Sequence, residues 1–200
     1  MAKTRVLFLC TQNSARSQMA EAFLREHGED RFKAYSAGCS VAEEIHPYTV
    51  RVMEEAGIDI KDQYPKGMRE YMGKMHFGYL ITVCARAEKE CPTVFPGVGL
   101  KLTWLFDDPR GAGVPEEERL EKFREVRDQI EAKILHWLEH PEDEIQKLKE
   151  EQERERQERL AAARREAGSR NAFATPEPSV AGATSASGVL ESEIGLVSLT

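Results

Sequence analysis

The chain alternates short apolar runs with longer stretches in which apolar residues recur every three or four positions. The runs cover residues 4–9, 33–37, 78–84 and 100–106, and their length is typical of buried strands. Strands that alternate with helices form a mostly parallel sheet with right-handed crossovers and helices on both faces. We therefore expect an α/β fold of three layers, in which helices flank a four-stranded, mostly parallel sheet.

Three helices are expected around this sheet. The first begins at Ser17, whose hydroxyl suits a helix N-cap, and the second begins at Pro47 and stops at Gly57. A third follows Pro115 and ends at Pro141. Ligands bind such folds at the carboxyl ends of the strands. The reactive residues expected at those ends are Cys10, Cys84, Asp107 and Asp108.

The composition changes twice after Pro141. Residues 142–167 are rich in Glu, Arg, Lys and Gln, and no heptad seam is sustained, so we expect a charged, solvated helix rather than a coiled coil. Residues 168–200 are dominated by Gly, Ser, Ala, Thr and Pro, which predicts a disordered tail. The expected organisation is a folded domain at residues 1–141, followed by the charged helix and the tail.

Charge and composition narrow the class of partner. The 200 residues include 28 basic and 35 acidic side chains, a net charge of -7, so the basic footprint of a nucleic-acid-binding protein is missing. No stretch approaches the roughly 20 apolar residues of a membrane span, and residues 1–9 lack a signal-peptide pattern. We expect a cytoplasmic protein that binds neither nucleic acid nor membrane. Its four cysteines are too few for a disulfide scaffold in a chain of this length and are expected to be reactive thiols.

Cys10 and Arg16 enclose a short loop between the first strand and the first helix. Amide N–H groups and the dipole at a helix N-terminus favour negative charge, so we expect the Cys10 thiol to ionise easily. The same donors can hold a tetrahedral oxyanion, and the Arg16 guanidinium can grip two of its oxygens. The pattern therefore predicts attack of sulfur on phosphorus or arsenic. The residues expected to bind the oxyanion are Thr11, Gln12, Asn13, Ser14, Ala15, Arg16 and Ser17.

Individual residues of this loop have further expected roles. Asn13 is expected to bond within the loop and to adopt a left-handed backbone conformation. Ser17 is placed to hydrogen-bond the Cys10 sulfur and lower its pKa, although either Ser14 or Ser17 could serve only as a helix cap. The alternative for the whole motif is a buried structural cysteine beside a surface arginine.

The loop and several short segments resemble the low-molecular-weight protein tyrosine phosphatases and the arsenate reductases built on the same fold. The resemblance covers residues 4–139 and implies that residues 1–141 are a phosphatase-like catalytic domain. Ala15 replaces a cysteine that is common in the phosphatases and several reductases, so a redox partner for Cys10 has to come from elsewhere. The segments that carry the resemblance are residues 10–17, 16–21, 35–38, 46–47 and 107–109.

Cys84 and Cys91 lie in a segment that can supply this partner. If the segment were helical, they would lie about 10 Å apart along the helix axis, whereas a disulfide needs Cα atoms about 4.4–6.8 Å apart. A bridge therefore requires unwinding, which suits a switch. The residues alone leave open that Cys84 is a core residue and Cys91 only the end of a helix. A similar Cys-x6-Cys-Pro segment in thioredoxin-coupled arsenate reductases implies that both are catalytic.

Asp108 directly precedes Pro109, and the resemblance implies that it is the general acid that protonates the leaving oxygen. Like-charge repulsion from an oxyanion would keep this carboxyl group partly protonated. The alternative is a turn, for which Asp-Asp-Pro is common chemistry. The residues that follow replace the aromatic pair of tyrosine phosphatases, which counts against an aryl phosphate substrate. They are Arg110, Gly111 and Ala112.

Other polar residues are expected to have no chemical role. Glu21 and Ser36 match positions that help to bind a monovalent cation in some arsenate reductases, but no acidic residue is in register near residues 64–66. We therefore expect no metal site, and no organic cofactor. Cys39 belongs to no motif and is expected to be a spectator thiol.

The predicted function is reduction of arsenate to arsenite by a thiol relay of Cys10, Cys84 and Cys91, regenerated by thioredoxin. Hydrolysis of a phosphate ester would need only Cys10, Arg16 and Asp108, and would leave the other two cysteines unexplained. One alternative is a low-molecular-weight protein tyrosine phosphatase that forms a Cys10 phosphoenzyme. The others are a catalytically idle phosphate-binding module, and an arsenate reductase that uses glutaredoxin, glutathione or mycothiol as reductant.

Overall fold

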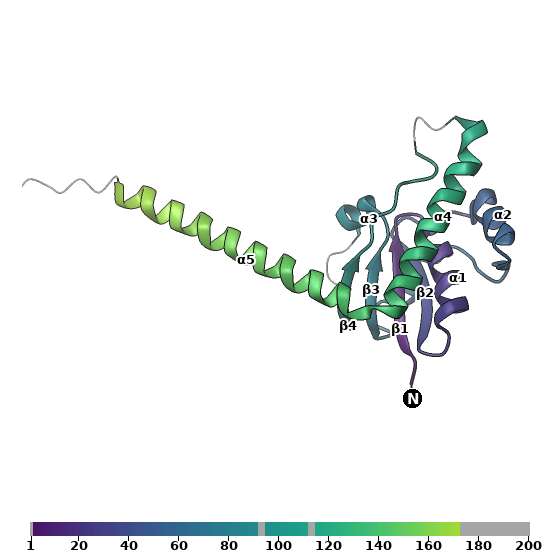
Figure 1. Ribbon diagram of the computed structural model, residues 1–200, viewed down its shortest axis with the longest axis horizontal. Helices are drawn as coiled ribbons and strands as arrows, with labels where there is room; N and C mark the ends of the chain where they lie inside the picture. The colour runs from purple at the N-terminus through teal and green to yellow at the C-terminus, as the bar shows by residue number, and fades with distance from the viewer. Residues whose placement is uncertain (1, 92–94, 112–114, 173–200) are drawn as a thin grey trace, which may run out of the picture. The chain divides into compact units, whose positions relative to one another are not determined.

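The computed structural model describes residues 2–91, 95–111 and 115–172 (Figure 1). Within the described residues, the chain divides after Glu153, so that residues 154–172 lie outside the first compact unit. The strands of the first unit are β1 Thr4–Cys10, β2 Phe32–Gly38, β3 Phe77–Thr82 and β4 Val98–Thr103. The helices are α1 Arg16–Gly28, α2 Pro47–Glu55, α3 Ala85–Glu90, α4 Glu116–Glu139 and α5 Pro141–Ala172, with a 3-10 turn at Met68–Glu70.

The strands form one parallel sheet in the order β2-β1-β3-β4. Helices flank this sheet, and α1 packs against both β2 and α4. The predicted α/β fold with a four-stranded parallel sheet is therefore confirmed. Because the chain moves from β1 to β2 on one side and to β3 on the other, the carboxyl ends of β1 and β3 form a switch point, where ligands bind in such sheets.

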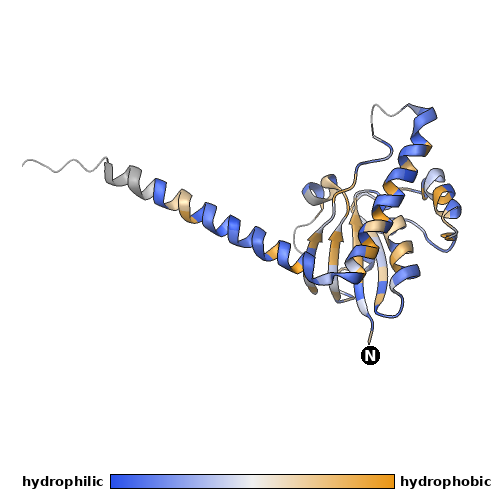
Figure 2. Ribbon diagram, in the orientation of Figure 1, coloured by the Kyte–Doolittle hydropathy of each residue, from blue (hydrophilic) through white to orange (hydrophobic). Residues whose placement is uncertain are grey.

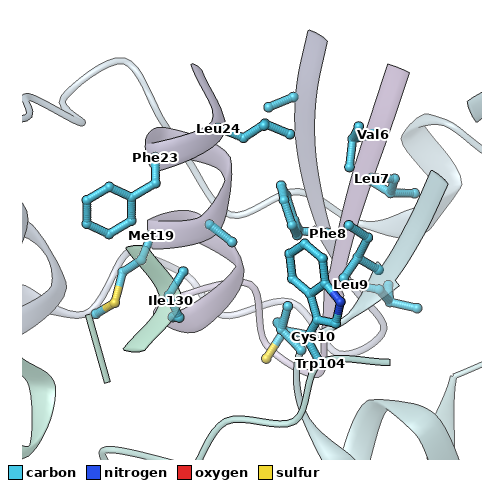
Figure 3. Close-up of a cluster of buried hydrophobic side chains, with 14 of the residues drawn as sticks. Val6, Leu7, Phe8, Leu9, Cys10, Met19, Phe23, Leu24, Trp104 and Ile130 are labelled. Atoms are coloured by element: carbon cyan, nitrogen blue, oxygen red, sulfur yellow. The ribbon is translucent and has the colours of Figure 1, made fainter. Parts of the chain in front are cut away.

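The core explains why β1 is a continuous apolar run. Residues 6–9 are buried, as expected for a central strand that is covered on both faces (Figure 3). Phe8 packs against Trp104 with ring centroids 6.2 Å apart. On the helices, Met19 of α1 and Ile130 of α4 are also completely buried. This packing fixes the end of β1, and with it the position of Cys10.

The boundary between α4 and α5 lies at Pro141. α4 ends at Glu139, as predicted, but Pro141 also begins the next helix, where a proline is tolerated because the first helical N–H needs no partner. Figure 2 shows that the strands are mostly hydrophobic, whereas α5 is hydrophilic over most of its length. Glu144, in the first turns of α5, accepts a hydrogen bond from Trp104 Nε1 at 3.1 Å and pairs with Lys133.

These contacts pack the start of α5, which is part of the first unit, against the end of β4 and against α4. Leu148 also packs against the core, one turn further along. The division of the chain after residue 141 remains a prediction, and the predicted tail lies outside the described residues from position 173 onward.

Candidate active site

The loop after β1 directs its carbonyl groups outward. The carbonyl oxygens of Thr11, Gln12 and Ser14 accept backbone hydrogen bonds from Ser40, Ala42 and His46, at 2.9–3.0 Å. Among the described residues, the amide N–H groups of residues 12–15 donate no hydrogen bond. They lie directly before the N-terminus of α1, where the helix dipole adds positive potential. Free amide donors at a helix N-terminus suit an anion, and we call this loop of residues 12–15 the cradle.

Gly38 allows this loop to lie close to β2. It pairs with Cys10 in the sheet register, and a Cβ atom at Gly38 would come within 2.7 Å of the Thr11 carbonyl oxygen. That distance is too short for a real contact, so any larger residue at this position would displace the loop.

Asn13 holds the inner side of the loop. Its φ of 52° is the predicted left-handed conformation, which is confirmed. Its side-chain amide donates to Ser17 Oγ at 2.9 Å and to Ser36 Oγ at 2.8 Å, and its Oδ1 accepts from the Lys66 amide at 2.7 Å. The N-cap of α1 is Ala15, so the prediction that Ser17 caps this helix is wrong. The Ser17 hydroxyl instead orients Asn13.

A buried ion pair is connected to Asn13 through Ser36. Glu21 accepts a hydrogen bond from Ser36 and pairs with Lys66 Nζ at 3.0 Å, and both charged side chains are almost fully buried. Lys66 Nζ also donates to the Tyr64 carbonyl at 3.0 Å. Residues 64–66, which contain no acidic residue, therefore supply a positive charge, the Lys66 ammonium group. Sequence reasoning missed Lys66 because it looked there for a ligand rather than for an ammonium group.

Two free thiols meet at the carboxyl ends of β1 and β3. Cys10 Sγ lies 3.4 Å from Cys84 Sγ, and both residues are buried. Cys84 is the N-cap of α3, and its sulfur accepts a hydrogen bond from the Ala87 amide at 3.3 Å. The Thr11 hydroxyl lies 3.5 Å from the same sulfur. The structure thus brings together the predicted nucleophile and the first predicted resolving thiol.

One hydrogen bond, from Cys10 to Cys84, shifts the pKa values of the two thiols in opposite directions. The hydrogen bond to Cys84 and burial raise the pKa of Cys10, although Arg16 acts to lower it. The same hydrogen bond lowers the pKa of Cys84, with help from Thr11 and the Ala87 amide. The prediction that Cys10 ionises easily is therefore wrong for this arrangement, because the Cys10 thiol donates its proton in the hydrogen bond to Cys84 and is buried. A proton has only to move between the two sulfurs to place the charge on Cys10.

Arg16 is fixed beside the cradle and keeps one donor unused. Its Nη1 donates to the Phe106 carbonyl at 2.9 Å, and its Nη2 lies 3.2 Å from Asp108 Oδ2. The Arg16 Nε–H is buried and has no hydrogen-bond partner among the described residues. An unpaired buried donor is costly, which points to an anionic ligand as its missing partner.

Asp108 faces two guanidinium groups. Burial acts to raise the pKa of this carboxyl group, but Arg16 and Arg110 outweigh burial and hold the pKa below its ordinary value. Arg110 Nε lies 3.2 Å from Asp108 Oδ1, and Arg110 Nη1 donates to Ser14 Oγ at 3.0 Å. Asp108 is thus ionised near neutral pH in this arrangement. The expected partial protonation would require an oxyanion close enough to offset the two cations.

Arg110 was missed as a site residue because the sequence was read only for the loss of the aromatic pair. Its guanidinium also bonds Gln12 Oε1, so it connects the oxyanion loop to the segment that carries Asp108.

Cys91 has a partner that the sequence did not suggest. Cys39 and Cys91 form a disulfide with Cα atoms 5.6 Å apart, within the range that disulfide geometry allows. Cys39 directly follows β2, beside the end of β1, and its Sγ lies 3.8 Å from the Cys10 carbonyl oxygen. The prediction that Cys39 is a spectator is therefore wrong. The feature of the sequence that could have indicated a partner for Cys39 is its position directly after β2, the strand that pairs with β1.

The fold and this site define a phosphatase-type loop, and the chain belongs to the low molecular weight phosphotyrosine protein phosphatase family, whose model matches residues 5–154. Among its relatives is the arsenate reductase of Bacillus licheniformis, which is 41% identical over 140 residues, covering 70% of this chain and 98% of that protein.

Solved structures agree with this assignment. An arsenate reductase in the phosphate binding state is 28% identical, with a TM-score of 0.54 and coverage of 66% of this chain and 95% of that chain. A thioredoxin-dependent arsenate reductase of Corynebacterium glutamicum is 26% identical, with a TM-score of 0.51 and coverage of 68% and 61%. No helix in the described part of the chain has the length and apolar character that a membrane span requires.

Proposed function

We propose that this protein reduces arsenate to arsenite through a relay of Cys10, Cys84 and Cys91, and that thioredoxin regenerates the thiols. The observation that carries the proposal is the 3.4 Å separation of the Cys10 and Cys84 sulfurs beside the anion cradle. A phosphatase needs the first of these sulfurs but not the second. Two neighbouring buried thiols supply the two electrons that reduce arsenic(V) to arsenic(III).

The first step joins sulfur to arsenic. Arsenate would bind to the free amides of residues 12–15 and to the unpaired Nε of Arg16. The Cys10 thiolate attacks arsenic, and a hydroxyl group leaves as water after it takes a proton from Asp108. Bound arsenate brings negative charge close to Asp108, which raises the pKa of its carboxyl group and allows it to act as the acid.

The second step transfers two electrons. Cys84, which holds the proton taken from Cys10, passes it to an oxygen on arsenic as its sulfur attacks the Cys10 sulfur, and the sulfur–arsenic bond breaks with its electron pair remaining on arsenic. Arsenite leaves, and a Cys10–Cys84 disulfide forms. The Cys91 thiolate then attacks the Cys84 sulfur and releases Cys10 as a thiolate. The two thiols of thioredoxin reduce the resulting bridge by the same exchange.

The family assignment keeps a second activity open, because Cys10, Arg16 and Asp108 also suffice to hydrolyse a phosphate ester through a Cys10 phosphoenzyme. We interpret this as a side activity of the same loop. Arg110 occupies the position where tyrosine phosphatases have an aromatic wall, so the site has a cation where an aryl group would stack. A relay that thioredoxin regenerates needs a reducing compartment, and we therefore infer a cytoplasmic location.

Replacing Cys84 tests the proposal. Cys84→Ser should abolish arsenate-dependent oxidation of thioredoxin but retain hydrolysis of p-nitrophenyl phosphate, because only the relay uses the second sulfur. Cys91→Ser is the matched variant, and it should still release about one arsenite per chain without reductant, since the Cys10–Cys84 disulfide can form. Undiminished arsenate turnover in Cys84→Ser would refute the relay.

A further inference from the structure

The relay described above uses three of the four cysteines, and the structure pairs its last member with the fourth. Cys91 is bonded to Cys39, while Cys10 and Cys84 are free. The oxidised pair and the reduced pair therefore coexist in one arrangement of the chain. A three-thiol relay does not account for this state, because it leaves Cys91 bonded to Cys84.

The Cys84–Cys91 and Cys39–Cys91 disulfides differ in whether they allow α3 to stay folded. Cys84 is the N-cap of this helix and Cys91 is its C-cap, with the Cys91 amide bonded to the Ala87 carbonyl at 3.0 Å. A bridge between residues at the two ends of a folded helix exceeds the Cα separation that a disulfide allows, so the Cys84–Cys91 bond requires α3 to unwind. The Cys39–Cys91 bond exists with α3 folded. Transfer to Cys39 therefore allows the helix to form again.

We propose that Cys39 is a fourth redox thiol, which takes over Cys91 from Cys84 and so regenerates the arsenate-reducing pair before any reductant arrives. The inference rests on the proposed function, since it starts from the Cys84–Cys91 bridge. The Cys39 thiolate attacks the Cys91 sulfur, the bond between Cys84 and Cys91 breaks, and Cys84 leaves as a thiolate. One disulfide is lost and one is gained, so no further oxidant or reductant is needed.

The consequence is storage of a second pair of electrons. After transfer, Cys84 again lies beside Cys10 with both sulfurs reduced, as in the present structure. A second arsenate can then be reduced while the first disulfide is still held by Cys39 and Cys91. Thioredoxin would reach this bridge through Cys39, which is half-buried and is followed by an exposed Ser40, whereas Cys91, Cys10 and Cys84 are buried.

A burst measurement tests this storage. The fully reduced protein, freed of reductant under anaerobic conditions, is mixed with excess arsenate, and arsenite is counted per chain. We expect about two arsenites per chain for the unmodified protein and about one for Cys39→Ser. Ser40→Ala is the matched control and should also give about two, because the Ser40 contact with the loop is made by its backbone amide.

Disulfide mapping identifies the sulfurs involved. Lysine and arginine residues separate the four cysteines, so that trypsin places them in four different peptides. After one equivalent of arsenate, we expect the Cys39 and Cys91 peptides to be crosslinked and the other two to be labelled by iodoacetamide. After excess arsenate, the Cys10 and Cys84 peptides should be crosslinked as well.

The outcomes separate this inference from the proposed function. About one arsenite per chain in the unmodified protein, with a Cys84–Cys91 crosslink, would overturn the role of Cys39 and leave the three-thiol relay intact. An undiminished burst in Cys39→Ser would also overturn it. If no arsenite is released by a protein that still hydrolyses p-nitrophenyl phosphate, arsenate reduction itself is refuted, and the role of Cys39 is refuted with it.

Discussion

Lys66→Met should destabilise the protein more than most single substitutions. The change removes the ammonium group that pairs with Glu21 at 3.0 Å, where the carboxylate side chain is only 1% exposed. Removing one partner of a buried ion pair leaves an uncompensated charge and typically costs about 3–5 kcal/mol. Arg25 and Ser36 still contact the carboxylate, so we expect the lower end of that range, about 3 kcal/mol.

The measurement is urea unfolding of the substituted proteins at constant pH and salt. Glu21→Gln combined with Lys66→Met removes the charge as well as its partner, and should recover about 2 kcal/mol relative to Lys66→Met alone. Lys61→Met is the matched control, because the Lys61 side chain is 69% exposed, and it should change the free energy of unfolding by less than about 0.5 kcal/mol.

The same substitution should weaken the site. The Lys66 amide holds Asn13, so movement of this segment would disturb the oxyanion loop and raise the KM for arsenate. If the double variant is as unstable as Lys66→Met, the cost does not come from the carboxylate that has lost its Lys66 partner, and the electrostatic argument is refuted.

Three further predictions concern charge and hydrogen bonding. Because the hydrogen bond that Cys10 donates to Cys84 raises the pKa of Cys10, Cys84→Ser should lower that pKa, and iodoacetamide should label Cys10 at lower pH than in the unmodified protein; an unchanged labelling profile would contradict this. Arg110→Ala should raise the pKa of Asp108, so that the alkaline limb of p-nitrophenyl phosphate hydrolysis moves to higher pH, whereas Arg110→Lys should move it less. Glu144→Ala removes the acceptor of a buried indole N–H and should lower the free energy of unfolding by about 1–3 kcal/mol in urea titrations; no change would show that α5 does not contribute to the stability of the first unit.

The four strands could be predicted because each is a separate apolar run. The residues at which each strand begins and ends could not be predicted. β4 begins at Val98, two residues before the predicted start, because glycines at positions 97 and 99 interrupt the apolar pattern. It ends at Thr103, and of the apolar residues that follow, Trp104 packs in the core, Leu105 is exposed, and the Phe106 carbonyl accepts a hydrogen bond from Arg16. The apolar run is therefore longer than the strand, and the pattern of apolar residues does not show where the strand ends.

The site was predictable where one loop carries it. Cys10 and Arg16 flank five residues in a strand-to-helix connection, and that local geometry follows from the neighbouring elements. The position of Cys39 beside Cys10 depends on the pairing of β2 with β1. The position of Arg110 depends on how the segment after β4 folds back onto the loop of residues 11–15. Neither is a property of spacing along the chain. The pKa of Cys10 depends in the same way on a sulfur 74 positions away.

The close approach of Gly38 to the oxyanion loop leaves no space between this loop and β2. With 2.7 Å between a hypothetical Cβ and the Thr11 carbonyl, the β2 side of the pocket has no room for a methyl group. Efforts to engineer selectivity for larger esters should therefore leave this side alone. Arg110, by contrast, reaches the loop through its side chain, which bonds the Gln12 and Ser14 side chains, so substitutions at this position can alter the site without displacing the loop backbone.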